Sequence, residues 1–411
     1  MTDGADDIIG WRWLDVRLAR RARRQASASL VPSRVRRAAT AVVAVVVQVG
    51  AFAILLCGAW LCTVRFPSAA LLPGTVLLLF GVLTLPRPPA LPRHAVTVRR
   101  ADAAALHALI DRTAAALNLP APHIVALDDR FAADSGFAGL LRRRYLRIGV
   151  PLWAVLDPAQ RTALVAMELA RFSGGDPSRT TLTGTVERTL ATMVSIFEPA
   201  ADKRLQASRE ADVTTMMAAN PQRIGQQHAQ SYTNLVGDLV RPLLALLQGA
   251  FGLVRLGYLT LLQPDAFQAV FAADARAAAA AGTPQVRSVL ATRLLAESMV
   301  TVLRRDARAG DRSGGAVPRD EPQAVVARWP ALAADVLAKA TPSMPERCEA
   351  DVTRHASPLA VNPPLGRRIE MLTEAPPSLP ANVRTEPQES AETDVELRPM
   401  YRRLVRDLRS G

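Results

Sequence analysis

Cysteine is scarce in this chain of 411 residues, which contains only Cys57, Cys62 and Cys348. The first two lie in one long hydrophobic run and the third is isolated. The sequence therefore contains neither a disulfide framework nor a Cys-x-x-Cys site. This usage is typical of a protein whose soluble part lies in the reducing cytosol.

Histidine is also rare, and its few positions lack the spacing of metal ligands. A hydrolytic zinc site needs three protein ligands and an open fourth position for water. We interpret every histidine as an ordinary surface or core residue, and we expect no resident metal. The histidines are His94, His107, His123, His228 and His355.

Lysine is nearly absent, since only Lys203 and Lys339 accompany the arginines that give a formal charge of +13. The sequence contains no nucleic-acid-binding motif and no aromatic pattern suited to stacking on bases. We therefore do not expect nucleic acid as a partner. The N-terminal arginines instead predict contacts with anionic lipid headgroups, to which each basic side chain contributes on the order of 1 kcal/mol.

Charged residues are missing from two long hydrophobic runs, residues 38–64 and 66–86, which Arg65 separates. At about 1.5 Å per residue, a helix of either length can cross a hydrocarbon core of roughly 30 Å. A cleaved signal peptide is the alternative for the first run. That run is preceded by residues 1–37, however, and it exceeds the ~7 to 15 residues of a signal core. We therefore predict a transmembrane hairpin.

Arginines cluster on both sides of the predicted hairpin, in residues 17–37 and 87–100. By the positive-inside rule, both flanks face the cytoplasm. The sequence thus predicts a multi-pass plasma-membrane protein with both termini and its main domain in the cytoplasm. A further apolar stretch, residues 239–262, contains two arginines, and we interpret it as a cytosolic or interfacial helix in preference to a third span.

A helix is well signalled after the second of two predicted strands, residues 123–127 and 145–150. Asp157 can cap its N-terminus, Pro158 suits the first helical position, and Gln160 completes a capping box. A glycine pair ends it. The order of these elements predicts an α+β core that is mostly helical.

Met167, Glu168 and Arg171 project from one broad face of this helix. In a zinc peptidase, His-Glu-x-x-His would place histidines at the first and last of these positions, and the glutamate would act as base on the zinc-bound water. Neither a thioether nor a guanidinium is a credible zinc ligand. Only the glutamate of the motif is present here.

With its surroundings, this segment resembles the M48 family of membrane metallopeptidases, of the Ste24 and HtpX type. The shared framework includes Pro151-Leu152-Trp153, the helix with Glu168, and Gly175-Asp176-Pro177. It continues in residues 269–274, where Val270 replaces the family's third ligand, a glutamate. It also continues in residues 362–364, where Asn362 replaces the histidine of a His-Pro-Pro element.

The resemblance covers about residues 86 to 380, and it implies a specific domain organisation. A two-helix N-terminal transmembrane hairpin would be followed by a cytoplasmic zincin-like M48 peptidase domain. The expected segments are a basic arm at 1–37, the hairpin at 38–86, the peptidase-like domain at 87–384 with a flexible loop at 304–322, and a charged, solvated tail at 385–411.

The resemblance also implies what has happened to the site. The family uses zinc, but all three ligand positions are replaced here, by Met167, Arg171 and Val270. We therefore expect no cofactor and an idle base at Glu168. We expect Arg171 to pair with a retained acid in place of the metal, because unpaired buried negative charge is costly. The residues assigned to supporting roles are Asp176, Asp274 and Asn362.

Three functional readings remain open on the sequence. The first is a catalytically inactive M48 homologue that acts as a scaffold or regulator by binding a protein partner in the former substrate groove. The second is an active membrane metalloendopeptidase whose metal is held by acids alone, which would favour a harder ion than zinc. The third is a structural membrane protein that binds anionic lipid. The acids available to the second are Glu168, Asp176, Glu187 and Asp274.

Overall fold

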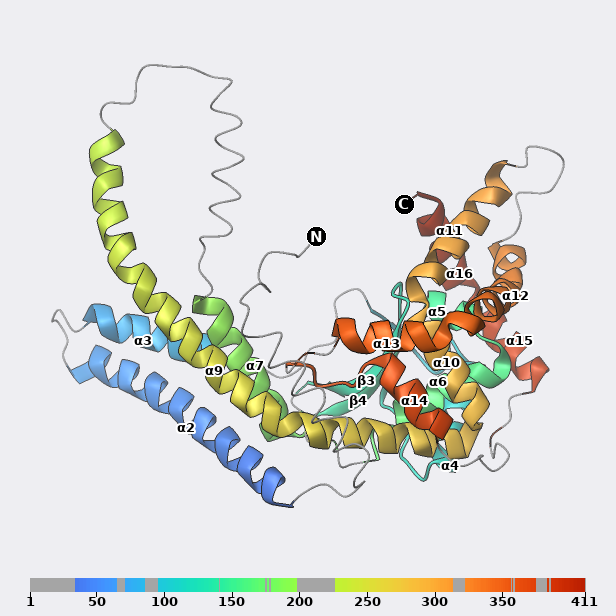
Figure 1. Ribbon diagram of the computed structural model, residues 1–411, viewed down its shortest axis with the longest axis horizontal. Helices are drawn as coiled ribbons and strands as arrows, with labels where there is room; N and C mark the ends of the chain where they lie inside the picture. Colours follow the sequence, from blue (N-terminus) through green and yellow to red (C-terminus); the bar gives the residue numbers. More distant parts are fainter. Residues whose placement is uncertain are drawn as a thin grey trace. The chain divides into compact units, whose positions relative to one another are not determined.

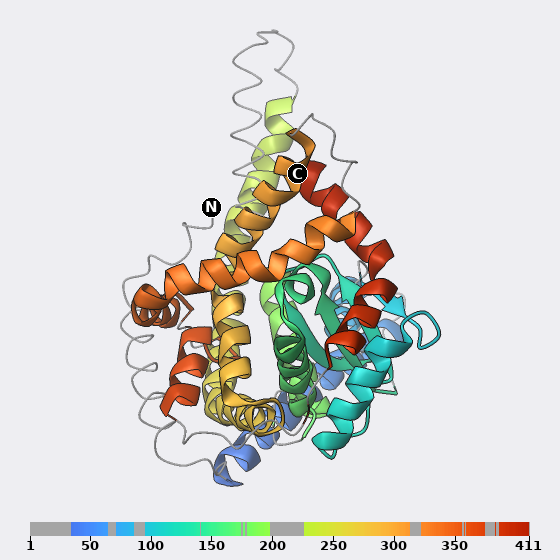
Figure 2. The ribbon, with the colours of Figure 1, turned by 90° about the vertical axis from the view of Figure 1, so that its right-hand side faces the viewer.

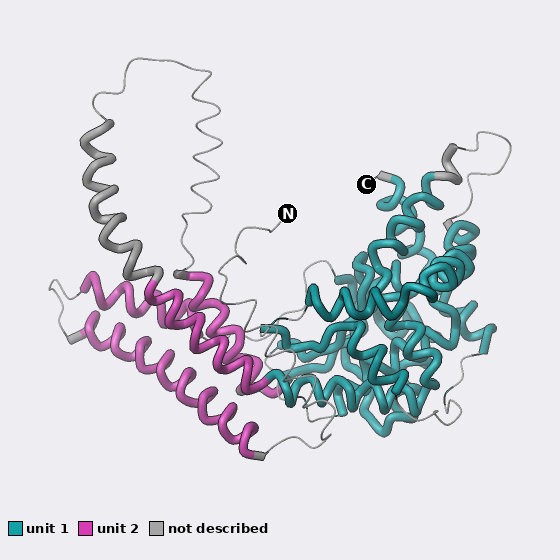
Figure 3. The backbone as a smooth tube through the Cα atoms, viewed as in Figure 1, with its two compact units in different colours: residues 1–33, 88–179, 263–411 teal, residues 34–87, 180–262 magenta. Residues whose placement is uncertain are grey.

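The chain is mostly helical, with one small mixed sheet (Figure 1). It divides into two compact units (Figure 3). Unit 1 takes its described residues from 88–179 and 263–411, and unit 2 takes its described residues from 34–87 and 180–262. The computed structural model describes residues 34–64, 71–85, 95–139, 141–173, 176, 179–197, 226–312, 322–355, 357, 359–374, 383 and 386–410.

The sheet of unit 1 has the strand order β1-β2-β4-β3. β2 and β4 are parallel neighbours, whereas β1 and β3 are antiparallel to their partners, so β3 lies at one edge. Ser135 of β3 lies opposite Leu146 of β4. The two predicted strands are confirmed as β2 and β4. The strands are β1 (Val96–Val98), β2 (Ile124–Asp128), β3 (Ala133–Ala138) and β4 (Arg143–Gly149).

The predicted site helix is confirmed as α6 (Pro158–Ala170). The Asp157 side chain accepts a hydrogen bond from the Gln160 backbone N at 2.8 Å, and Gln160 Oε1 accepts one from the Asp157 N at 3.0 Å. This is the expected capping box. Every residue from Arg161 to Ala170 is buried, so α6 is a central helix of the unit. The helices that precede α6 in unit 1 are α4 (Ala104–Ala116) and α5 (Val150–Val155).

The rest of unit 1 is helical and surrounds the sheet and α6 (Figure 2). Its core includes Trp153, Trp329 and Tyr401, all nearly fully buried. The elements are α10 (Thr283–Leu294), α11 (Ala296–Arg312), α12 (Pro322–Ala340), η2 (Thr341–Ser343), α13 (Met344–His355), α14 (Leu365–Glu374), α15 (Pro387–Glu396) and α16 (Arg398–Ser410).

The C-terminal segment is not a solvated tail, which corrects the expectation for residues 385–411. α15 and α16 are helices, and α16 buries Tyr401, Leu404 and Val405 in the core of unit 1. The apolar residues of α16 recur at helical spacing among the charges, so they form a single stripe. The prediction of a flexible loop at 304–322 is also partly wrong, because α11 continues to Arg312. Residues 313–321 of this predicted loop lie outside the described part.

Unit 2 consists of long helices. α2 (Arg34–Val64) and α3 (Leu71–Thr84) pack antiparallel, since Gly58 lies against Leu78 and Gly81 lies against Leu55. A Cβ at Gly58 would come within 2.4 Å of the Leu78 backbone N, so only glycine permits this approach. The unit also contains α7 (Thr181–Phe197) and the first part of α9 (Gln226–Ala281).

One segment among the described residues, Val35–Thr63, is long and apolar enough to cross a membrane by length and composition. It displays large apolar side chains, including Val46, Leu56 and Trp60. The predicted second span, 66–86, is represented by α3 alone, because the flanking residues are not described. The 14 residues of α3 extend about 21 Å, which is shorter than a hydrocarbon core.

α9 is one continuous helix of 56 residues. Residues 239–262 are its central part, and the same helix runs on from unit 2 into unit 1. Arg255, one of the two arginines in this apolar stretch, forms an ion pair with Glu187 of α7 at 3.0 Å. Tyr258 donates a hydrogen bond to the Thr183 carbonyl at 2.9 Å.

Candidate functional site

Glu168 is the centre of the candidate site, and its side chain is 1% exposed. The Ser135 hydroxyl of β3 lies 3.0 Å from Glu168 Oε2 and 2.8 Å from the Glu168 carbonyl oxygen. Arg293 Nη1, from α10, lies 3.4 Å from Glu168 Oε1. The carboxylate is therefore held by an edge strand and by a helix more than one hundred residues further along the chain.

Arg171 follows the last residue of α6, and it forms an ion pair with Glu168, one of the retained acids that the sequence offers as its partner. Its Nη1 lies 3.9 Å from Glu168 Oε2, at the long end of ion-pair distances. Its Nη2 donates a hydrogen bond of 2.5 Å to Asn362 Oδ1. The structure thus brings together three of the candidate residues, and Asn362 orients the arginine.

Asp274 is not the partner of Arg171 but of Arg368, a residue of α14. Two hydrogen bonds of 2.6 and 2.7 Å join the guanidinium to the carboxylate, and both side chains are almost fully buried. Burial alone would lower the pKa of Arg368, but the charge and hydrogen bonds of Asp274 outweigh it and the pKa is raised. Of the two retained acids, Asp274 is therefore balanced by Arg368.

Arg171→Ala should lower the Tm by about 2 to 4 °C, which corresponds to about 1 kcal/mol. The loss is modest because the pair with Glu168 is long, although the Arg171 side chain is only 14% exposed. Thermal unfolding of the detergent-purified protein measures it, with Arg354→Ala, at an exposed position of α13, as the control. An unchanged Tm for Arg171→Ala would show that this arginine does not stabilise the site.

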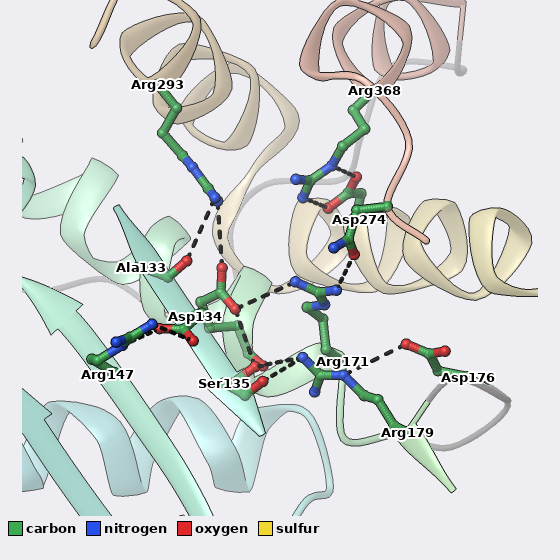
Figure 4. A network of polar contacts seen from close by, with 12 residues as sticks. Ala133, Asp134, Ser135, Arg147, Arg171, Asp176, Arg179, Asp274, Arg293 and Arg368 are labelled. Atoms are coloured by element: carbon green, nitrogen blue, oxygen red, sulfur yellow. Dashed lines mark hydrogen bonds and ion pairs between the residues drawn. The ribbon is translucent and has the colours of Figure 1, made fainter. Parts of the chain in front are cut away.

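Two arginines contact the free edge of β3. Arg179 Nη2 donates to the Ser135 carbonyl at 2.6 Å, and Arg293 Nη2 lies 3.5 Å from the Ala133 carbonyl (Figure 4). Residues two apart on a strand direct their carbonyls to the same side, so both contacts are on one edge. A peptide that added to this edge as a further strand would need these carbonyls as acceptors.

The same arginines carry perturbed protonation equilibria. Burial, followed by the charge of Arg171, lowers the pKa of Arg179 to about 10. Burial also lowers the pKa of Arg293, against the opposing effect of Glu168. Asp176, a candidate residue from the sequence, lies 3.5 Å from Arg179 Nε. Guanidinium groups stay protonated in proteins, so Arg179 and Arg293 contribute permanent positive charges to the site.

Asp134, next to Ser135 on β3, belongs to a second ionic cluster beside the site. Arg147 makes two hydrogen bonds of 2.5 and 2.7 Å to its carboxylate. Burial and the neighbouring charge of Glu168 raise the pKa of Asp134 to about 6, although Arg130 acts in the opposite direction. The negative charge of Glu168 therefore contributes to the raised pKa of a carboxyl group in the second cluster.

The other two replaced ligand positions are apolar and buried. Met167 of α6 is 1% exposed and Val270 of α9 is 2% exposed. Among the residues that the structure describes, no group of three or more His, Cys, Asp or Glu side chains is placed to hold a metal ion. The described arrangement offers Glu168 arginine and serine donors.

The sequence did not identify Arg179, Arg293 or Arg368 as members of the site. Arg293 and Arg368 reach it from helices that are remote in the sequence, so no local spacing reveals them. The available signal was indirect: two retained acids in a chain without metal ligands require cationic partners. Arg368 could have been suspected, because it follows the Asn-Pro-Pro element closely.

No protein-family model, curated protein or solved structure matches this chain.

Proposed function

We propose that this chain is a membrane-anchored, catalytically inactive relative of the M48 metallopeptidases that acts as a scaffold or regulator by binding a protein partner. One observation carries the proposal: Glu168, the residue at the position of the catalytic base, is buried and faces Arg293, Arg171 and the Ser135 hydroxyl. In this setting both carboxylate oxygens of Glu168 already face cationic or hydroxyl donors, which favours a structural role over that of a free base.

Charge balance supports this reading. A zinc ion would bring two positive charges to the carboxylate of Glu168, and Arg171 and Arg293 bring the same total. Arginine stays protonated in proteins, so the replacement is permanent over the physiological pH range. In the proposed pseudopeptidase, these structural ion pairs supply the positive charge that the metal supplies in the M48 family.

The acids that could form a metal site without histidine are all paired with arginine. Binding an ion through them would require the loss of these ion pairs, each of which would leave a guanidinium without its partner. This favours the inactive reading over an enzyme with unusual ligands. The pairs are Glu168 with Arg293, Asp176 with Arg179, Glu187 with Arg255, and Asp274 with Arg368.

Membrane anchoring in this proposal rests on α2, whose segment Val35–Thr63 is long and apolar enough to span a bilayer. The antiparallel packing of α3 on α2 supports a hairpin, and the arginines that flank the hydrophobic runs support a cytoplasmic location for both ends. The arginines on the edge of β3 imply that a partner is held by contacts other than strand addition at Ala133 and Ser135.

Metal analysis tests the proposal directly. Detergent-purified protein would be incubated with Zn²⁺, Mn²⁺ and Mg²⁺, desalted, and analysed by mass spectrometry for metal, with Glu168→Ala as the control. We expect well below one ion per chain in both proteins, because each candidate carboxylate is already paired. Stoichiometric metal that is lost in Glu168→Ala would contradict the proposal and favour the peptidase with acidic ligands.

A further inference from the structure

α11 and α16 lie side by side in unit 1 (Figures 1 and 2). Arg409 Nε of α16 donates a hydrogen bond of 3.0 Å to the Ala307 carbonyl of α11, which joins the two helices directly. Each helix buries an apolar stripe, with Leu303 and Ala307 from α11 and Tyr401 from α16. Their other faces are exposed and consist largely of arginine.

These exposed side chains define an arginine surface. Within the described part of the chain, none of its members makes a side-chain hydrogen bond or ion pair. Of the acids on the same helices, Asp306 forms an ion pair with Arg328 and accepts a hydrogen bond from Trp329, and Asp407 lies 3.7 Å from Arg403. The members are Arg304, Arg305, Arg308, Arg398, Arg402 and Arg406.

The arrangement is unfavourable without a partner. Arg304 and Arg308 are four residues apart on α11, and Arg398, Arg402 and Arg406 repeat the same spacing on α16. Like charges at this spacing repel each other on a helix surface. A surface that concentrates cations in this way generates a positive potential, which an extended anionic partner would neutralise.

We propose that the arginine surface binds the anionic headgroups of the bilayer in which the same chain is anchored. This inference rests on the membrane anchor of the proposed function, and it concerns a surface separate from the N-terminal arginines. Because unit 1 is covalently joined to α2, an anchored chain keeps it at high effective concentration near lipid. Guanidinium groups bind phosphate and carboxylate oxygens in a bidentate manner, and both are present in anionic headgroups.

Single-stranded nucleic acid is a less suitable partner for this surface. Binding to single strands relies on aromatic side chains that stack on bases. Tyr401 is the only aromatic residue of α16, and it is 2% exposed, while α11 has no aromatic residue. The surface therefore offers charge without a stacking platform, which suits a layer of headgroups.

Arginine footprinting tests the inference on the full chain. The protein would be reconstituted in nanodiscs of phosphatidylcholine, with or without about 30% phosphatidylserine, and treated with phenylglyoxal before peptide mass spectrometry. We expect modification of the arginine surface to be at least about fivefold slower in the anionic discs. The difference should disappear at about 0.5 M salt, where screening acts over a few ångströms. Arg143, Arg287 and Arg354, exposed elsewhere on unit 1, should react equally in both.

A matched pair of variants adds a second readout. Arg305→Gln, Arg402→Gln and Arg406→Gln together should abolish the lipid-dependent protection of the remaining members, because binding depends on their combined charge. The same number of substitutions at Arg143, Arg287 and Arg354 removes equal charge from other sites and should leave the protection intact. Equal loss in both variants would show only a response to total charge and would overturn the inference.

The outcomes separate this inference from the proposal on which it rests. Equal reaction rates in both kinds of disc would overturn the proposal that the arginine surface binds anionic lipid. The proposed membrane anchor would be unaffected by that result. Protection by an added nucleic-acid duplex, without protection by phosphatidylserine, would overturn it in favour of nucleic acid. If the chain does not enter discs at all, the proposed anchor fails. The same footprint on the free chain, with anionic vesicles added, then decides the inference by itself.

Discussion

Arg368→Met will lower the free energy of unfolding by about 3 to 5 kcal/mol. The substitution keeps most of the volume of the side chain but removes the charge, and it leaves Asp274 buried without its two hydrogen bonds. The Arg368 and Asp274 side chains are 6% and 3% exposed, so water cannot replace the lost partner. Chemical denaturation of the detergent-purified protein measures the loss.

The neighbouring residue provides a matched control. Arg367 forms an ion pair with Glu370 at 2.8 Å, but that glutamate is 39% exposed. Arg367→Met should therefore cost less than about 1 kcal/mol. The double variant Arg368→Met/Asp274→Leu removes both charges and should recover most of the stability, because a buried pair contributes little beyond an apolar replacement. Similar small losses for both single variants would show that the buried pair does not stabilise the fold.

Met167→His, Arg171→His and Val270→Glu together will create a site that binds about one zinc ion per chain. The two histidines would lie one turn apart, the first on α6 and the second directly after its last residue, and the glutamate would lie one turn before Asp274 on α9. The triple variant also removes Arg171 from the side of Glu168. Zinc content after desalting, measured by mass spectrometry, gives the result.

The structure sharpens the design of this experiment. Arg293 would still lie 3.4 Å from Glu168 and would oppose a cation there. Adding Arg293→Gln should therefore tighten zinc binding relative to the triple variant. The two-histidine variant that keeps Val270 lacks the third ligand and serves as the control, with much weaker retention expected. A triple variant that unfolds cooperatively but takes up no zinc would argue against a metallopeptidase-like arrangement of α6 and α9.

The local features of the site were predictable from the sequence. α6 begins with a capping box that involves only Asp157 and Gln160, so its start depends on neighbouring residues. β2 is a short apolar run bounded by turns and was equally clear. β3 was missed, because Asp134, Ser135 and Gly136 give it neither apolar alternation nor strong strand propensity.

The pairing of the charges was not predictable in the same way. The sequence indicates that Glu168 and Asp274 need cations, but it offers many arginines of similar local context. Arg293 and Arg368 are selected by the packing of α10 and α14 in unit 1, which brings together residues about one hundred positions apart. Tertiary structure alone decides which guanidinium faces which carboxylate.

The arginine contacts on β3 have a consequence for self-association. An exposed sheet edge is a template on which a second copy of the chain can add a strand and begin to aggregate. Here Arg179 and Arg293 cover the carbonyls of Ser135 and Ala133 with cationic side chains. The groups that balance the charge of Glu168 and Asp176 thus also act as gatekeepers against intermolecular β-pairing at that edge.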